Sequence, residues 1–231
     1  MPDPPGRNHW RAPPAAPVGD LDEPIPDWIG WGVRIETSAG PAEAQIDHPD
    51  DPAFLLVFTH GAGGGVDSRD ILTVRDTALA AGGVVARVLQ PYRVAGRRAP
   101  GKPEPQDRAW VELVGALRSD LGPELPLIQG GRSNGARVAC RTAGELGARG
   151  IVAVSFPLHP PGKPEKSRRD ELLAAAPAEV VVINGGSDPF GVPDPADAAE
   201  VRVIAGQPHS FAKGFETIAE TLAPWFRCWR H

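Results

Sequence analysis

From about residue 54 to its C-terminus, the chain alternates short apolar runs with amphipathic segments. The runs are rich in Val and Ile and lack polar alternation, as expected of strands covered on both faces. The segments between them carry apolar residues at helical spacing, and the helix predicted over residues 107–121 has Asp107 as its N-cap. This alternation predicts an α/β fold with a mostly parallel central sheet and helices on both faces. The predicted strands, of which the first two form an antiparallel pair, are residues 31–37, 42–46, 54–58, 84–89, 125–128, 151–156, 179–183 and 200–204.

One strand-to-helix junction, Leu125–Ala139, contains a Gly-x-Ser-x-Gly motif centred on Ser133. A strand, a tight glycine turn, a serine and then a helix form the setting in which this motif makes a nucleophile elbow. Gly131 and Gly135 would let the turn close without Cβ clashes, and the strained turn would expose the Ser133 hydroxyl. The alternative is an ordinary Gly/Ser loop between a strand and a helix.

Two later loops supply a candidate acid, Asp188, and a candidate base, His209, each directly after a predicted strand. Ligand sites of open α/β sheets lie beyond the carboxyl ends of the strands, so these loops are expected to meet near Ser133. The chain order Ser, Asp, His is that of the α/β-hydrolase triad. Taken singly, an Asp before a Pro is more often a solvated turn residue, which is the alternative for Asp188, and His60 is a competing base.

A glycine-rich loop, residues 59–65, follows the predicted strand 54–58. It lacks both the phosphate-loop and the dinucleotide-binding glycine patterns. The preferred interpretation is an oxyanion hole in which the backbone N–H groups of Ala62 and Asn134 point at a developing negative charge. His60 would then orient this loop by hydrogen bonding. A purely structural glycine turn is the alternative.

Six stretches of the chain together resemble a compact bacterial α/β-hydrolase family that is related to dienelactone hydrolases. That family shares its domain with a subunit of a eukaryotic histone acetyltransferase complex. The matching stretches are THGAGG at 59–64, QPYR at 90–93, GRSNG at 131–135, FPLHPPGKP at 156–164, GSDPFG at 186–191 and HSF at 209–211. The resemblance covers about residue 30 to the C-terminus. It implies an α/β-hydrolase fold with Ser133 as nucleophile, Asp188 as acid and His209 as base.

The chain departs from that family after the nucleophile, where Asn134 and Ala136 replace a frequent hydrophobic residue and a second glycine. This departure leaves the substrate preference open. Candidate substrate-binding residues in or beside the strand-end loops are His60, Tyr92, Arg132 and His159. For His159, a role in packing its loop is an equal alternative. The stretch 157–178 is too short for an inserted lid, so little or no lid domain is expected.

Composition limits the class of protein further. The 231 residues are 41% hydrophobic and 23% charged, with a net charge of −5, which predicts a single globular domain over residues 27–231. Residues 1–26 are proline-rich and are expected to form a flexible or extended arm.

Neither nucleic acid nor a membrane is expected as a partner, because no basic block and no long apolar run occurs. No metal site is expected, since no Cys/His cluster has ligand spacing. The N-terminus lacks a secretory signal, so a cytoplasmic location is expected; the oligomeric state stays open.

These features predict a serine hydrolase that cleaves a small ester through a Ser-His-Asp triad and an acyl-enzyme, as a carboxylesterase or dienelactone-hydrolase-like enzyme. The expected partner is a small-molecule substrate, and the chemistry calls for no cofactor. Two alternatives remain. The same triad would serve a serine peptidase acting on short peptides. A non-catalytic interaction module could also keep the fold, since fold alone does not determine function.

Overall fold

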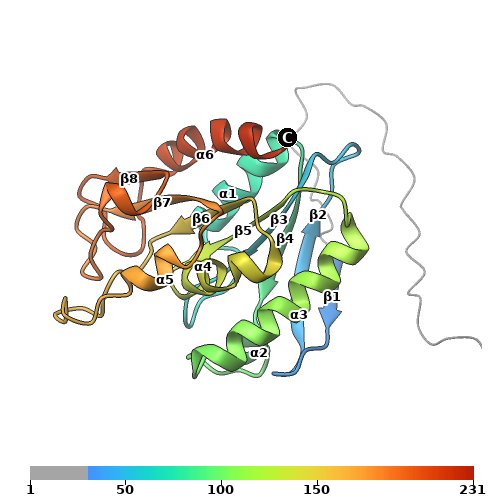
Figure 1. The fold of residues 1–231 in the computed structure, drawn as a ribbon, viewed down its shortest axis with the longest axis horizontal. Helices are drawn as coiled ribbons and strands as arrows, with labels where there is room; N and C mark the ends of the chain where they lie inside the picture. Colours follow the sequence, from blue (N-terminus) through green and yellow to red (C-terminus); the bar gives the residue numbers. More distant parts are fainter. Residues whose placement is uncertain (1–30) are drawn as a thin grey trace, which may run out of the picture.

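The computed structural model describes residues 31–231, in which helices cover both faces of one eight-stranded sheet (Figure 1). The predicted arm, residues 1–26, lies outside the described residues. The strands are β1 Trp31–Ile35, β2 Ala42–Asp47, β3 Phe54–Thr59, β4 Gly83–Leu89, β5 Leu127–Arg132, β6 Gly150–Val154, β7 Glu179–Gly185 and β8 Glu200–Ile204. The helices are α1 Arg69–Ala80, α2 Pro91–Val94, α3 Pro103–Leu121, α4 Asn134–Leu146, α5 Arg169–Leu173 and α6 Phe215–Trp229, with a 3₁₀ turn at Pro195–Asp197.

The strand order across the sheet is β1-β2-β4-β3-β5-β6-β7-β8. The first two strands pair antiparallel, and β2 pairs antiparallel with β4. From β4 to β8, every neighbouring pair is parallel. The predicted mostly parallel sheet with an antiparallel start is therefore confirmed. The six parallel strands end at one edge of the sheet, so the loops that follow them gather there.

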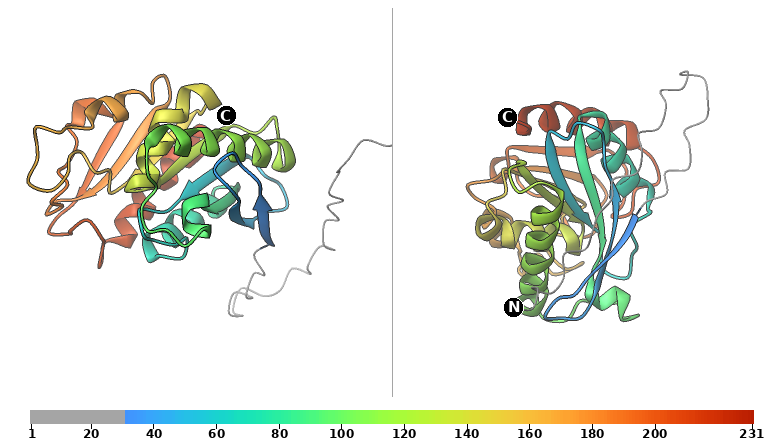
Figure 2. Two further views of the ribbon diagram at one scale, coloured as in Figure 1. Left: turned by 90° about the horizontal axis from the view of Figure 1, so that it is seen from below. Right: turned by 90° about the vertical axis from the view of Figure 1, so that its right-hand side faces the viewer.

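The alternating side chains of β3 explain why both faces carry helices. Phe54, Leu56 and Phe58 pack into the apolar core under α1 and α6. Leu55 and Val57 point the other way, into the core under α3. All five are at most 1% exposed, and full burial of such side chains stabilises a fold by about 1.5 to 3 kcal/mol each. In the right-hand view of Figure 2, α3 and α1 lie on opposite sides of the strands.

Helix α3 begins one turn earlier than the sequence indicates, so the prediction of Asp107 as its N-cap is wrong. The helix starts at Pro103, and the first turn also contains Pro105. Proline is tolerated there because the N–H groups of the first turn have no helical partner. The Asp107 carboxylate instead accepts a hydrogen bond of 2.8 Å from Nε of Arg141 on α4. Asp107 therefore joins two helices rather than capping one.

Strand β5 also runs further than predicted, through Gly130 and Gly131 to Arg132. Its neighbours approach so closely that a Cβ on Gly130 would lie 2.5 Å from the carbonyl oxygen of Val152. These glycines are therefore strand residues, and the turn is confined to Ser133. Between β6 and β7 the only helix is α5, so the domain has no lid, as predicted. None of the helices within residues 31–231 is both long and apolar enough to span a bilayer.

Candidate active site

Ser133 lies at the junction of β5 and α4 in a conformation that serine seldom adopts. Its φ is 52° and its ψ is −112°; strained backbone of this kind costs about 1 to 3 kcal/mol. Two glycines make the turn possible. A Cβ on Gly131 would lie 2.4 Å from the carbonyl carbon of Gly135, and a Cβ on Gly135 would lie 2.8 Å from the carbonyl oxygen of His60. The close approach of α4 to β3 and β5 thus requires glycine at both positions.

The structure brings the side chains of Ser133, His209 and Asp188 into one hydrogen-bonded chain. Nε2 of His209 lies 2.9 Å from Oγ of Ser133, and Nδ1 of His209 lies 2.7 Å from Oδ2 of Asp188. A carboxylate can only accept here, so Nδ1–H of His209 donates to Asp188 and Nε2 is free to accept the serine proton. The side chain of Asp188 has no exposed surface. This arrangement matches a base held in one tautomer beside a nucleophile.

Phe190, which the sequence analysis did not single out, completes the surroundings of the histidine. Its ring centroid lies 4.3 Å from that of His209. Its backbone N–H donates a 2.8 Å hydrogen bond to Oδ1 of Asp188. The loop after β7 therefore supplies the acid and also a packing surface for the base. A Phe two residues after a turn Asp carries no signal that would have identified it.

The two predicted oxyanion donors, Ala62 and Asn134, lie on loops that meet at Ser133. A Cβ on Gly61 would come within 3.1 Å of Cβ of Ser133, so the glycine-rich loop packs directly against the nucleophile. The backbone N–H groups of Ala62 and Asn134 have no hydrogen-bond partner within residues 31–231. Asn134 is the first residue of the 13-residue α4, where N–H groups and the helix dipole favour negative charge.

His60, predicted as a substrate contact, is buried in the structure beside the glycine-rich loop. Its side chain has no exposed surface. Nδ1 is 2.8 Å from the carbonyl oxygen of Gly61, and Nε2 accepts a 3.1 Å hydrogen bond from the backbone N–H of Gln90. Burial lowers the pKa of His60 to about 4, against the opposing effect of the Gly61 bond, and the charge of Arg93 lowers it further. The ring is therefore a neutral support for the glycine-rich loop, with both nitrogens engaged.

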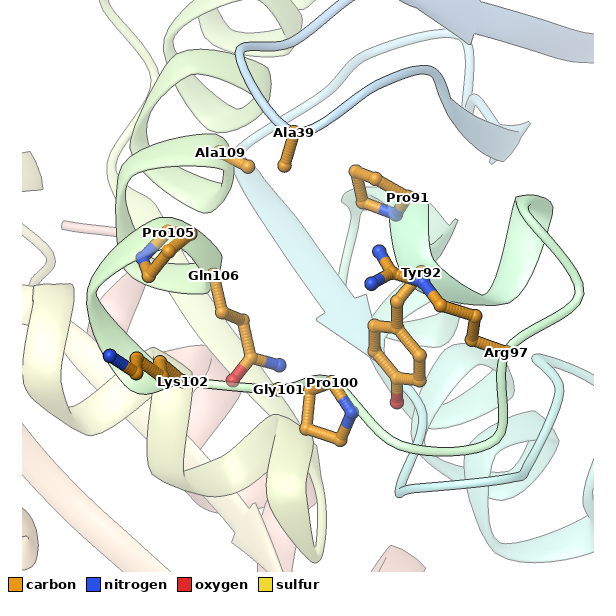
Figure 3. Close-up of a pocket in the computed structure, with 10 residues that line it drawn as sticks. All are labelled: Ala39, Pro91, Tyr92, Arg97, Pro100, Gly101, Lys102, Pro105, Gln106 and Ala109. Carbon is orange, nitrogen blue, oxygen red and sulfur yellow. The ribbon is translucent and has the colours of Figure 1, made fainter.

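Tyr92 is also buried, and its hydroxyl lies 3.5 Å from Nδ1 of His60. Burial raises the pKa of Tyr92 to about 12, while the charge of Arg93 acts in the opposite direction. The ring lines a cavity of about 200 Å³ between α2 and the start of α3, whose walls also carry Arg97 and Lys102 (Figure 3). No triad residue lines this cavity. Tyr92 thus contacts His60 and lines a cavity that does not include Ser133.

Arg132 has protein partners on three sides. Its Nε forms a 2.8 Å ion pair with Oδ2 of Asp70 at the start of α1. Its Nη2 donates to the carbonyl oxygen of His209 at 3.1 Å and to Oγ of Ser210 at 2.7 Å. A Cβ on Gly61 would lie 3.2 Å from Nη1. The guanidinium predicted to contact substrate is therefore engaged within the protein.

His159 packs between two strand-end loops. Its backbone N–H donates a 2.9 Å hydrogen bond to the carbonyl oxygen of Phe190. A Cβ on Gly191 would lie 2.5 Å from Nε2 of His159, so the ring rests against that glycine. The geometry favours the loop-packing alternative for His159, and it ties the loop after β6 to the loop that carries Asp188.

Comparison with known proteins agrees with this architecture. Residues 52–216 match the family model described as alpha/beta hydrolase domain, which is more than half of the chain. The chain therefore belongs to the α/β-hydrolase family, as the sequence predicted. No match was found among curated proteins. The predicted link to a histone acetyltransferase subunit stays a prediction.

Solved structures of three bacterial proteins have the same fold. A serine hydrolase homologue from Coxiella burnetii is 13% identical, with a TM-score of 0.68 over 84% of this chain and 96% of that chain. An α/β serine hydrolase without a lid from Xanthomonas campestris is 16% identical, with a TM-score of 0.67 over 90% and 98%. A dienelactone hydrolase from Anabaena variabilis is 17% identical, with a TM-score of 0.68 over 87% and 97%. Each is matched over nearly its full length, so the likeness covers the whole domain.

Proposed function

We propose that the protein is a serine hydrolase that cleaves small esters through Ser133, His209 and Asp188. The observation that carries the proposal is the continuous hydrogen-bonded chain from Ser133 Oγ through His209 to Asp188, with distances of 2.9 and 2.7 Å. Its position at the carboxyl edge of a parallel sheet, on the strained turn of an elbow, is where α/β-hydrolases hold their nucleophile. The relatives named as a serine hydrolase and a dienelactone hydrolase support the same class.

The proposed reaction has two halves. In the first, Nε2 of His209 takes the Ser133 proton while Oγ bonds to the ester carbonyl carbon. The tetrahedral intermediate then expels the alcohol, which leaves with the proton from His209. In the second, water gives a proton to His209 and its oxygen attacks the acyl-enzyme. Collapse of that intermediate releases the acid, and the proton returns to Ser133.

Asp188 and two backbone groups would support these steps. The Asp188 carboxylate fixes the histidine tautomer and stabilises the imidazolium. The N–H groups of Ala62 and Asn134 would donate to the oxyanion, and loss of one such donor elsewhere costs about 3 to 4 kcal/mol of transition-state stabilisation. Both donors are free to bind a ligand atom, because neither has a partner within residues 31–231.

The test is active-site labelling with a fluorophosphonate probe, together with hydrolysis of p-nitrophenyl acetate. The folded wild type should be labelled, and Ser133→Ala should lose the label and at least about 1000-fold in kcat. Absence of labelling in the wild type, or equal labelling of Ser133→Ala, would contradict the proposal and favour a non-catalytic module. A matched ester and anilide of one acyl group would separate esterase from peptidase. Faster turnover of the anilide would favour the peptidase.

A further inference from the structure

The loop that carries the candidate base has little main-chain support of its own. It joins β8 to α6, and its other anchors lie at Gln207. The Gln207 carbonyl accepts from the N–H of Ser187 at 3.0 Å, its N–H donates to Ile204 at 3.3 Å, and its side-chain oxygen accepts from the N–H groups of Ala212 and Lys213 at 3.1 Å. Within residues 31–231, the one group that hydrogen-bonds to the main chain of His209 is Nη2 of Arg132, at 3.1 Å. Asp188 and Phe190 hold the imidazole itself, and the Arg132 contact is what holds the main chain that carries it.

Arg132 can hold that loop because its own position is fixed. The side chain of Asp70 is 6% exposed and that of Arg132 is 16% exposed. Besides the ion pair with Arg132, Asp70 accepts from the Ser68 hydroxyl at 2.5 Å and from the backbone N–H of Ile71 at 3.0 Å. The carboxylate is thus tied to the start of α1, and charge-assisted bonds of this kind are the stronger class of hydrogen bond.

We infer that Arg132 is a positioning residue, which locks the His209 loop to α1 and so keeps Nε2 of His209 within reach of the nucleophile. This inference rests on the proposed function. Arg132 acts through His209 and does not itself meet the reacting atoms. A displacement of about 1 Å in a catalytic group can cost about 100-fold in rate. Ser133 follows Arg132 directly, so one short segment carries the nucleophile and also sets the distance to its base.

The arrangement requires the planar fork of arginine. Nε faces Asp70 while Nη2 faces the loop, and both bonds form at once from one rigid group. A lysine ammonium is a single point charge on a flexible stem. Lysine at this position could keep the pair with Asp70 or reach the loop, but it could not hold both in a fixed geometry.

The experiment compares Arg132→Met and Arg132→Lys with Arg137→Met. Arg137 is a matched control because its side chain is 19% exposed and bonds only to Glu171, at 2.6 Å, in the part of the chain that the structure describes. Its one link to Ser133 is a backbone hydrogen bond of 3.3 Å, which the substitution keeps. Arg132→Met should lower kcat on p-nitrophenyl acetate about 100-fold with little change in KM. The kcat of Arg132→Lys should fall between that of Arg132→Met and that of the wild type. Arg137→Met should lose thermal stability to a similar degree and keep its kcat.

Amide hydrogen exchange gives a second readout that does not depend on catalysis. Residues 207–212 should exchange faster in Arg132→Met and Arg132→Lys than in the wild type or Arg137→Met. Unchanged exchange there, or a kcat equal to that of Arg137→Met, would overturn the inference. If Arg132→Met does not fold, Arg132→Lys decides by the same two criteria. A wild type that resists the fluorophosphonate probe contradicts the proposed function instead, and the exchange result still decides whether Arg132 holds the loop.

Discussion

His60 shows at the residue scale how burial selects a protonation state beside a reactive centre. Its ring must donate to the Gly61 carbonyl and accept from the Gln90 N–H at the same time, which only neutral imidazole can do. Burial, which lowers its pKa to about 4, favours that same form. A protonated ring would lose the bond from Gln90 and so loosen the oxyanion loop.

The lowered pKa of His60 predicts an acid-sensitive contribution to stability. The folded pKa of about 4 lies below the ordinary value of 6.5, so between these values the unfolded chain binds a proton that the folded chain does not. The free energy of unfolding should therefore fall as pH drops from 6.5 to 4, by about 3 kcal/mol from this residue. Urea denaturation at several pH values gives the free energy of unfolding of the wild type and of His60→Gln. The difference between the two free energies should shrink by that amount as the pH falls. Above pH 7 the difference should be constant, and a constant difference down to pH 4 would contradict the prediction.

Residue roles differ in how far the sequence reveals them. Ser133, Asp188 and His209 could be proposed because each follows a predicted strand, and parallel strands bring such loops together. The ion pair between Asp70 and Arg132 could not be predicted from the sequence. An acidic residue in the first turn of a helix is common, since it complements the helix dipole. Nothing in the sequence distinguishes such an Asp from one that anchors a distant arginine.

At the scale of elements, the position of the elbow depends on how closely α4 approaches β3. The relevant residue is Gly135, where a Cβ would lie 2.8 Å from the carbonyl oxygens of Thr59 and His60. Backbone atoms form this contact, so they cannot move aside as a flexible side chain would. The start of α4 therefore sets the distance between Ser133 and the glycine-rich loop.

Two helical glycines should respond to alanine in opposite ways. Gly135→Ala should push α4 from β3, destabilise the protein by about 1 to 3 kcal/mol and lower kcat. Gly115→Ala, in the exposed interior of α3 with nothing within 4 Å of the added Cβ, should stabilise it by about 0.5 to 1 kcal/mol and leave kcat unchanged. Thermal denaturation measures the stability of both variants, and ester hydrolysis measures their kcat. Wild-type activity in Gly135→Ala would show that the close approach is not needed.

The sequence pattern predicts every strand of the sheet. The buried parallel strands such as β3 leave uninterrupted apolar runs, whereas β1 and β2 show the alternation of an antiparallel pair. Element boundaries are less certain, as α3 and β5 illustrate. Pro103 and Pro105 conceal a helix start that tolerates them, and the glycines before Ser133 indicate a turn although they lie in a strand. Both differences arise where neighbouring elements, rather than local preference, decide the backbone.

At the scale of the whole domain, residues 31–231 include no inserted lid, since the segment between β6 and β7 contains only the five-residue α5. Lids close over a bound substrate and often limit turnover. This site is bounded instead by strand-end loops that are tied to one another, with His159 bonded to the loop of Asp188 and Arg132 to the loop of His209. The site should therefore be accessible without a large rearrangement.

This architecture predicts the response to a sparingly soluble ester. The initial rate should level off as the ester concentration passes its solubility limit, with no step at that point, because no lid has to open on a lipid surface. The test measures hydrolysis rates of p-nitrophenyl butyrate at concentrations below and above that limit. Light scattering, recorded in parallel, shows where droplets form. A sharp rise in rate on droplet formation would mean that a segment covers the site in water.

The left-handed backbone at Ser133 has a consequence for the stability of the protein. A φ of 52° is unstrained for glycine, whereas for serine it costs about 1 to 3 kcal/mol. The free energy of unfolding of a whole protein is only about 5 to 15 kcal/mol. Replacing Ser133 by glycine would remove this strain together with the hydroxyl that the proposed reaction needs. The strain is therefore a stability cost that the proposed chemistry would account for.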